Sequence, residues 1–501
     1  MEVVFYGKQG KKKGLLSRIS SPEEAAGLIK DGMTVAFGGY TPSGYPKVIT
    51  GELVKRKNNG DDFKINVITG ANVGPEIDDA LGQAKLINRR SPLQGCRELG
   101  NSINKGFVKY IEVPLNKMPR TVRCGLLGKI DVAVIEAIAI TEDGNIVPGP
   151  AVGMDPIFVE AADTVIVEIN SAQLAELEGM HDIYISDLPP NKKPVPLTYT
   201  NERIGQPFIK VDPEKIKCIV ASDIPDCTPI FAKEDQTSQR LATNLLNFLE
   251  LEVASKRMPK LLPLQSGLGN SANALVKAFE KSNFQDIEFY CGVLQEANIE
   301  LIATGKVKAA SGGSFTSSPV VMDLLRKNPQ LYKEEMVLRP SDISNNAEII
   351  SRLGLITLNN AIELDIYGNA NTSHIAGNKV VNGIGGGASF AQNAFLSVML
   401  LPSTSKGGDI STIVPMATHN DISEHDLDII VTENGVADLR GKDPVERAQC
   451  VIDNCASEIY KAQLNSYLQK SIKNAGGHQP VLLDEAFSWY KRLKETGSMK
   501  E

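Results

Sequence analysis

The feature that most constrains the fold is a repeated order of apolar strand, glycine turn and helix. It is clearest in residues 261–315, where Gly267 and Gly269 lead into a helix expected to begin near Ser271. Backbone N–H groups at such a turn, together with the positive end of the helix dipole, can hold a phosphate or another anion. This segment therefore favours a nucleotide-like ligand, although the same turn is also common in proteins that bind none.

The pattern extends over the whole chain. Early on, an apolar segment, Met33–Phe37, runs into a glycine turn and a helix expected over Val48–Lys57. Other β-branched apolar segments are separated by helical or polar stretches, which is typical of buried parallel strands. The expected strands are Ile65–Thr69, Tyr110–Val113, Val132–Glu136, Val165–Ile169, Ile287–Cys291, Val307–Ala310, Glu348–Thr357, Ala394–Leu401, Ser411–Val414 and Ile429–Thr432, and the tail Pro444–Trp489 is expected to be helical. We predict an α/β protein.

The length of 501 residues favours two domains, which we place at 1–222 and 223–501. Near the end of each half the same order recurs: acidic residue, buried strand, acidic residue and glycine turn, in Asp131–Val147 and Asp426–Gly441. This indicates a duplicated α/β domain. The active site is then expected in the cleft between the halves, at the carboxyl ends of the strands.

Composition excludes several classes of partner. The net charge is −7, and the only basic run, Lys11 to Lys13, is short and expected to be solvated, so no nucleic-acid or membrane surface is predicted. The longest apolar run, Ala394–Pro402, is shorter than the roughly 18–20 residues that span a bilayer. The start of the chain lacks the apolar core of a secretory signal, and we expect a cytoplasmic protein, with a mitochondrial presequence as the alternative.

The cysteines are odd in number and scattered, without a CxxC pair or histidines at metal-ligand spacing. They are Cys96, Cys124, Cys218, Cys227, Cys291, Cys450 and Cys455. We expect reduced thiols and no metal site. Cys291 ends an expected strand next to a helix expected from Val293 onward, a position that favours the reactive thiolate, although a small buried hydrophobic side chain is the commoner role.

Other candidates stand alone. Glu433 closes an expected strand and precedes Asn434 and Gly435, so it could project into a cleft or be a surface turn acid. Four histidines, each a possible general base or a satisfied polar residue, are His181, His374, His419 and His425.

Longer motifs then carry a resemblance to a known family. They are LLPLQSGLGNSANAL, ASGGSFTSSP, VLRPSDISN, DIYGNANTSH, NGIGGGASFA, PSTSKGGDIS and TENGVADLRG, with EEAAGLIKDGMTVAFGGYTPSG and AVIEAIAITEDGNIVP in the first half. In this order they resemble the acetyl-CoA hydrolase/transferase family, and its succinyl-CoA:acetate CoA-transferases in particular. The resemblance implies two tandem CoA-transferase-type α/β domains, a homodimer, and an acyl-CoA substrate whose coenzyme A is bound mainly by the second domain.

The resemblance also implies roles for single residues. In this family a glutamate attacks the acyl-CoA thioester, and backbone N–H groups stabilise the oxyanion. The resemblance implies that the amides of Gly385 and Gly386 stabilise the oxyanion, and that Asn345 faces the substrate carboxylate. It places Glu433 near the site. The implied coenzyme A site contains Gly267, Gly269, Asn270 and Lys406.

Two positions depart from the family pattern. Where the family reads SEVLQD or TEVIQD, this chain reads CGVLQE, so Gly292 stands in place of the nucleophilic glutamate. Where the family reads PDRN, with an arginine for the carboxylate substrate, this chain has Cys227. One buried charge of each sign is removed, which leaves no unpaired charge.

Four mechanisms are compatible with these departures. In the first, coenzyme A is transferred to a small carboxylate without a covalent intermediate. In the second, the acyl group is taken by water or by Cys291, alone or with Cys227. In the third, the protein binds acyl-CoA without turnover, and in the fourth, Glu296 acts as a displaced nucleophile. The last is disfavoured because one helical turn, about 5.4 Å, is too large a misplacement.

Overall fold

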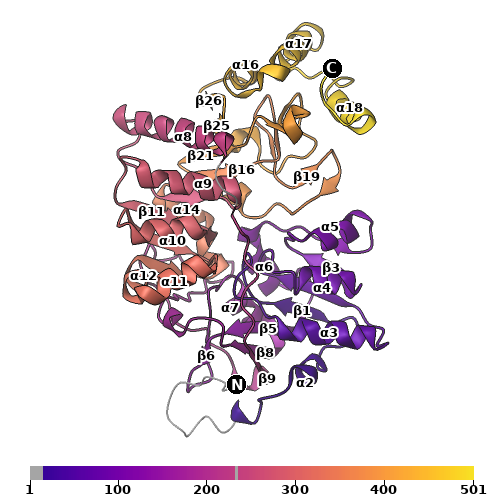
Figure 1. The fold of residues 1–501 in the computed structure, drawn as a ribbon, viewed down its shortest axis with the longest axis vertical. Coiled ribbons are helices and arrows are strands. Elements are labelled where there is room, and N and C mark those ends of the chain that lie inside the picture. The colour runs from indigo at the N-terminus through magenta and orange to yellow at the C-terminus, as the bar shows by residue number, and fades with distance from the viewer. Residues whose placement is uncertain (1–14, 232–234) are drawn as a thin grey trace. The chain divides into compact units, whose positions relative to one another are not determined.

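The computed structural model describes residues 15–231 and 235–501, so the basic run at Lys11 to Lys13 lies outside the described residues. The chain forms two compact units (Figure 1). Unit 1 contains residues 1–230 and 288–349, and unit 2 contains residues 231–287 and 350–501. A segment from the middle of the chain therefore packs with the N-terminal part.

Unit 1 is built on a parallel seven-stranded sheet in the order β4-β3-β2-β1-β5-β8-β9. The strands are β1 (Thr34–Phe37), β2 (Ile65–Thr69), β3 (Ile87–Ser91), β4 (Lys109–Tyr110), β5 (Ile130–Ala137), β8 (Ala162–Asn170) and β9 (Ile216–Ser222). Helices α3 (Val48–Asn58), α4 (Asp78–Gln83) and α5 (Arg97–Asn104) lie along one face, and α6 (Met118–Arg123) and α7 (Asp155–Ala161) lie on the other (Figure 1). The strands predicted at Met33–Phe37, Ile65–Thr69, Val132–Glu136 and Val165–Ile169 are confirmed as β1, β2, β5 and β8. The strand predicted at Tyr110–Val113 overlaps β4 only at Tyr110, and β3 and β9 were not predicted.

The fold of this sheet follows from burial of its central strands on both faces. Every residue of β1 is buried, and Val35, Phe37, Val132 and Val134 belong to one core with residues of α3. Parallel strands need crossover connections, and helices supply the apolar cover for both faces. The sequence therefore shows continuous apolar runs at these strands instead of alternation.

The segment 288–349 joins unit 1 through isolated bridges, Ala151 with Ser314 and His181 with Leu338. Its elements are β11 (Ile287–Tyr290), β12 (Val293–Leu294), α10 (Glu296–Ala303), β13 (Val307–Gly312), β14 (Ser314–Phe315), α11 (Pro319–Lys327), α12 (Pro329–Glu335), β15 (Met336–Leu338) and α13 (Ser341–Ser344). Strand β12 pairs in parallel with β14, and β13 pairs in parallel with β15.

Two predicted elements are wrong. The helix expected from Val293 begins only at Glu296, because Val293 and Leu294 form β12 and Gln295 is the N-cap. The strand expected over Glu348–Thr357 is instead helix α14 (Ala347–Leu353) followed by β16 (Ile356–Asn360). A run of Ile and Leu is compatible with either element, and Asn346, which caps this helix through Glu348 N, decides between them.

Unit 2 contains the parallel strands β10 (Leu264–Ser266), β16, β21 (Leu396–Leu400) and β25 (Ile429–Thr432), in this order, and β26 (Gly435–Asp438) returns antiparallel to β25. Its helices are α8 (Gln236–Ala254), α9 (Asn270–Ala278), α15 (Gly387–Asn393), α16 (Pro444–Cys455), α17 (Glu458–Asn474) and α18 (Ser488–Thr496). Tyr460 and Trp489 of the tail helices pack into one core with β21 and β25. The predicted helical tail is confirmed.

Two findings concern the described residues as a whole. None of their helices is long and apolar enough to cross a membrane. All seven cysteines lie within this part of the chain, and each carries a free thiol.

Candidate active site

Gly292 lies between β11, which ends at Tyr290, and β12, which begins at Val293, and backbone hydrogen bonds hold this segment. The N–H of Cys291 donates to the Ser311 carbonyl at 2.9 Å, and the N–H of Gly313 donates to the Gly292 carbonyl at 2.9 Å. The following pair of residues continues as β12 beside β14. The position of residue 292 is therefore fixed by strands, which suits a site that needs defined geometry.

A side chain would fit at residue 292. The Cβ of an added side chain would have Asn345 Oδ1 at 3.5 Å, Asn345 Nδ2 at 3.8 Å and Tyr40 Oη at 3.9 Å as its nearest neighbours, which are ordinary van der Waals distances. The backbone of Gly292 is not in the left-handed region that favours glycine. Neither backbone strain nor crowding therefore requires a glycine here.

The groups around this space are polar and neutral. The amide nitrogen of Asn345, Nδ2, donates to Tyr40 Oη at 3.0 Å and to Ser344 Oγ at 3.0 Å. Tyr40 and Asn345 are each 1% exposed. Burial raises the pKa of Tyr40 to about 12, so its hydroxyl keeps its proton near neutral pH. The space next to Gly292 is bordered by a hydroxyl and an amide.

Neither cysteine near the site has the features of a thiolate nucleophile. The Cys291 side chain is 0% exposed, and its expected place at a helix N-terminus is not found, because α10 begins at Glu296. Cys227 is exposed, but burial of its thiol and the nearby carboxylates of Glu76 and Asp226 raise its pKa. Both residues stay predictions as catalytic groups.

The Glu296 carboxylate accepts a hydrogen bond from the Ser318 hydroxyl at the N-terminus of α11. Glu296 is half-buried, and this contact joins α10 to α11. Its role as a displaced nucleophile stays a disfavoured prediction.

A buried charged cluster fixes the loop that precedes α3. Lys47 Nζ lies 2.6 Å from Glu136 Oε2 and 2.8 Å from Asp226 Oδ1, and all three side chains are 0% exposed. Glu168 accepts hydrogen bonds from the backbone N–H of Lys47 at 2.8 Å and of Val48 at 3.2 Å. Three carboxylates thus share one ammonium group and the N-terminus of α3.

The protonation of this cluster follows from its burial. Burial raises the pKa of Glu136 to about 8, although Lys47 acts in the opposite direction. Burial alone would lower the pKa of Lys47, but the charges of Glu136 and Asp226 outweigh it and raise the value. Lys47 is charged, and Glu136 takes up a proton within the neutral pH range.

Asp226 connects this cluster to the segment that carries Gly292. Its Oδ2 accepts hydrogen bonds from Ser317 Oγ at 2.6 Å, from Gln173 Nε2 at 3.0 Å and from Gly44 N at 3.1 Å. Cys227, the next residue, donates its backbone N–H to Tyr45 Oη at 3.0 Å. The aspartate of the PDRN position therefore has a structural role that does not depend on its neighbour.

In unit 2, Glu433 holds a loop. It follows β25 and accepts hydrogen bonds from the backbone N–H of Ser403 at 2.8 Å and from the Ser403 hydroxyl. This loop continues to Lys406, which is exposed and has a positive φ of 47°. Glu433 therefore positions the segment that carries the exposed ammonium group of Lys406.

The predicted glycines of unit 2 lie at two helix N-termini. Gly269, with φ 100°, is the N-cap of α9, which begins at Asn270, and the N–H of Gly267 donates to the Leu358 carbonyl at 2.7 Å. Gly385 has φ 61°, and Gly386 is the N-cap of α15. These turns are built as the sequence indicates, and their roles toward coenzyme A stay predictions.

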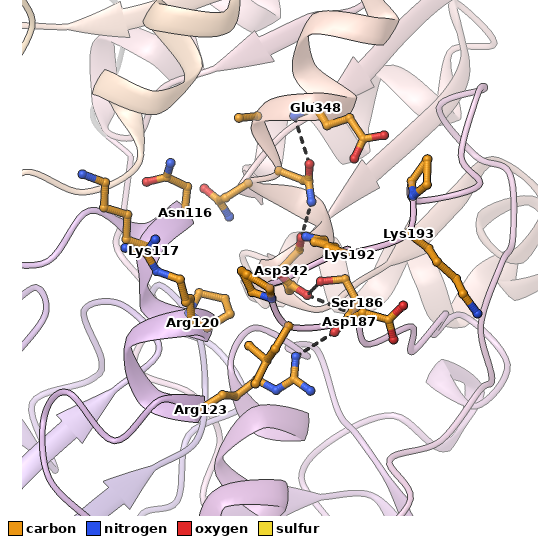
Figure 2. A pocket seen from close by; sticks show the side chains of 17 residues that line it. Asn116, Lys117, Arg120, Arg123, Ser186, Asp187, Lys192, Lys193, Asp342 and Glu348 are labelled. Atoms are coloured by element: carbon orange, nitrogen blue, oxygen red, sulfur yellow. Dashed lines mark hydrogen bonds between the residues drawn. The ribbon is translucent and has the colours of Figure 1, made fainter.

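A pocket of about 630 Å³ in unit 1 was not predicted (Figure 2). Cationic side chains from two separate segments line it, namely Lys117, Arg120, Arg123, Lys192 and Lys193, together with Asp187, Asp342, Asn345 and Glu348. Arg123 is already engaged, since Nη1 donates to the Ser186 carbonyl at 2.7 Å and Nε lies 3.0 Å from Glu160. The pocket shares Asn345 with the Gly292 site. The Lys and Arg residues clustered at 117–123 and 192–193 are the sequence signal from which it could have been predicted.

Of the four candidate histidines, only His181 belongs to the same unit as Gly292. His181 is buried, its Nε2 lies 2.9 Å from the Gly149 carbonyl, and burial lowers its pKa to about 4. His374 stacks on His419 with ring centroids 3.7 Å apart in unit 2, and His425 is exposed. Among the described residues no group of three His, Cys, Asp or Glu side chains is arranged to hold a metal ion.

The sequence matches two family models, the acetyl-CoA hydrolase/transferase N-terminal domain over residues 6–221 and the C-terminal domain over residues 321–468. It is 43% identical to a succinyl-CoA:acetate CoA-transferase of Clostridium kluyveri, covering 97% of this chain and 91% of that protein. It is 38% identical to an acetyl-CoA hydrolase of Neurospora crassa, covering 98% and 96%. The fold is similar to that of RipA from Yersinia pestis, with a TM-score of 0.74, 18% identity, and coverage of 92% of this chain and 99% of that one.

Proposed function

Because the chain belongs to the acetyl-CoA hydrolase/transferase family and is an enzyme of that family, we propose that it transfers coenzyme A from an acyl-CoA directly to a small carboxylate. No covalent intermediate forms on the protein in this mechanism. The observation that supports the proposal is the Gly292 site, where a fixed backbone position accommodates an added Cβ and the three nearest atoms belong to the neutral side chains of Tyr40 and Asn345.

The reaction balances without any further reactant. A carboxylate oxygen of the acceptor attacks the thioester carbonyl, the C–O bond forms, the C–S bond breaks, and the sulfur leaves as the coenzyme A thiolate. The thiolate then attacks the acceptor's carbonyl carbon in the mixed anhydride. A new C–S bond forms, the C–O bond from that carbon to the bridging oxygen breaks, and the original acid leaves as a carboxylate. The two carbonyl carbons exchange partners, and no proton is consumed.

The chain's own residues bind and orient the substrates in this proposal. The amides of Gly385 and Gly386 stabilise the oxyanion that develops at the carbonyl. The turn at Gly267, Gly269 and Asn270 and the ammonium group of Lys406 bind coenzyme A, and Glu433 supports this binding by holding Ser403 in the same loop. Coenzyme A enters only as a substrate. The homodimer and the cytoplasmic location stay predictions.

A cysteine mechanism has less support. Transfer to a thiol needs an accessible thiolate, whereas Cys291 is 0% exposed and the pKa of Cys227 is raised by burial and neighbouring acids. Water could in principle enter the same space, and the test below separates that outcome from transfer.

Steady-state kinetics with acetyl-CoA, propanoyl-CoA and succinyl-CoA, each against free acetate, propanoate and succinate, test the proposal. We expect intersecting double-reciprocal lines, which report a sequential mechanism, and an unchanged intact-protein mass after incubation with acyl-CoA alone. Parallel lines, a mass gain from an acyl or coenzyme A adduct, or thioester loss at the same rate without acceptor would overturn direct transfer.

A further inference from the structure

We infer that the acceptor carboxylate binds in the space beside Gly292, held by a hydrogen bond from the Tyr40 hydroxyl. This inference rests on the proposed direct transfer and adds where the second substrate lies. It assigns to Tyr40 a contact with the reacting carboxylate.

The hydrogen bonds leave Tyr40 with a proton to donate. A carboxamide nitrogen has two hydrogens, and those of Asn345 go to Tyr40 Oη and Ser344 Oγ, both at 3.0 Å. Tyr40 Oη is therefore an acceptor in that contact. Burial raises the pKa of Tyr40 to about 12, so the hydroxyl keeps its proton near neutral pH. The contact with Asn345 Nδ2 does not use the phenolic hydrogen, which can therefore be donated to a ligand.

The distances fit a small carboxylate. The nearest atoms to the position of a Cβ at residue 292 are 3.5–3.9 Å away and belong only to Asn345 and Tyr40. Gly292 itself is partly exposed, so a ligand can reach it, although Tyr40 and Asn345 are buried. A carboxylate here has no cation among these nearest neighbours, and a charge-assisted hydrogen bond from a phenol is the contact that can hold it.

This placement makes the acceptor occupy the region into which a side chain at residue 292 would extend. The acceptor's carboxylate then attacks the thioester from a position beside residue 292, which the strands β11 and β12 define. Acceptors with a small group next to the carboxylate should react best, because the backbone of Gly292 forms one wall of the proposed acceptor site.

The first test is Gly292→Ala. The added methyl meets no atom closer than 3.5 Å, so the fold is retained, but the methyl competes with the acceptor. We expect the KM for acetate to rise by about tenfold or more, while the KM for acetyl-CoA changes by less than about twofold. Gly51→Ala in α3, where nothing lies within 4 Å of the added Cβ, is the matched control and should change neither constant.

The second test is Tyr40→Phe, which keeps the ring and removes the donor. We expect the KM for acetate to rise about tenfold, as for loss of one hydrogen bond to a charged group, with little change in the KM for acetyl-CoA. Tyr332→Phe is the matched control, because its hydroxyl is also buried in unit 1 but donates to the Ile299 carbonyl at 3.4 Å. A general loss of packing would affect both substrates and both variants.

The outcomes separate the two proposals. Sequential kinetics with unchanged acetate KM in Gly292→Ala or in Tyr40→Phe would overturn this placement of the acceptor and leave direct transfer standing. Parallel lines or a covalent adduct in the unaltered enzyme would overturn direct transfer itself. An equal rise in the KM for acetate and for acetyl-CoA would assign a structural role to Tyr40 and would also overturn the inference.

Discussion

Around Lys47, unit 1 buries charges and pairs them, whereas around Gly292 it buries only neutral polar groups. In the first region one ammonium group contacts Glu136 and Asp226 at 2.6 and 2.8 Å. In the second, Tyr40 and Asn345 share a hydrogen bond of 3.0 Å, and neither carries a charge. Both regions lie in the same unit. A hydrogen bond from the Ser317 hydroxyl to Asp226 connects the Lys47 cluster to the chain segment that carries Gly292.

The difference shows which charges belong to the fold and which would arrive with a substrate. A buried charge is costly unless it is paired, so the Lys47 cluster is stable only while it is complete. The Gly292 site has no such requirement when it is empty. It can therefore accept a carboxylate from solution without leaving a buried charge unpaired after the product departs.

Breaking the charged region should give the largest effect. Lys47→Met leaves Glu136, Glu168 and Asp226 buried together without their cation, and we expect a loss of about 3–5 kcal/mol in the free energy of unfolding. Urea unfolding monitored by circular dichroism measures it. Lys55→Met in α3 is the control, because that lysine is 70% exposed and its pair with Glu52 contributes little. Equal stabilities of the two variants would contradict the comparison.

Adding a charge to the neutral region should change the mechanism instead of the stability. Gly292→Glu adds a carboxylate at a position where a Cβ meets only ordinary van der Waals contacts, and an internal nucleophile has a large advantage over one from solution. We expect the kinetics to change from intersecting to parallel lines, with a rise on the order of a hundredfold in the rate at low acceptor concentration.

Intact-protein mass after exposure of Gly292→Glu to acyl-CoA gives an independent readout, since a glutamyl-CoA thioester adds the mass of coenzyme A less one water. Gly292→Gln is the matched control, because it has the same length without the nucleophile and should form no adduct. If Gly292→Glu keeps intersecting lines and an unchanged mass, the space at residue 292 is not oriented toward the thioester.

The sequence predicted the parts of the molecule that depend on local patterns. Continuous apolar runs gave β2 and β25 at their observed bounds, and the capping and glycine signals gave α3 and α9 to within a residue at their starts. Runs of Ile and Leu near residue 350 were ambiguous, because helix and buried strand share that composition. There the prediction failed.

The site was only partly within reach of sequence reasoning. The position of Gly292 followed from its motif, but its contact with Tyr40 joins residues far apart in the chain, and no local pattern reports such a contact. The same is true of Lys47 and Asp226, which a charge count treats as solvated. Tertiary packing brings these residues together. The sequences of the strands that carry them do not indicate which distant residues they will contact.

The pH dependence of stability sharpens the comparison further. The pKa of Glu136 is about 8 in the folded protein against 4.5 for an ordinary glutamate, so folding takes up a proton between these values. The free energy of unfolding should therefore fall as pH rises across this window, by at most about 1.4 kcal/mol per pH unit for this group. In Glu136→Gln that fall should be smaller, as urea unfolding at pH 5, 6, 7 and 8 would measure. Glu52→Gln, at the exposed pair in α3, should keep the original slope, and identical slopes in all three proteins would contradict the assignment.

The smallest effect is expected at the cationic pocket, which shares Asn345 with the neutral site (Figure 2). Lys192 and Lys193 are exposed, so each contributes only weakly to the binding of an anion. If an acceptor's second charged group extends toward this pocket, Lys192→Glu with Lys193→Glu should raise the KM for succinate about threefold to fivefold and leave that for acetate nearly unchanged. Lys105→Glu with Lys109→Glu changes the net charge equally at exposed positions outside the pocket lining, and it corrects for long-range attraction. If the two double variants change the KM for succinate equally, recognition of the acceptor is restricted to the neutral site. If the pocket variant raises this KM more than the control does, and the difference disappears at high salt, recognition of the acceptor extends from Asn345 into the pocket.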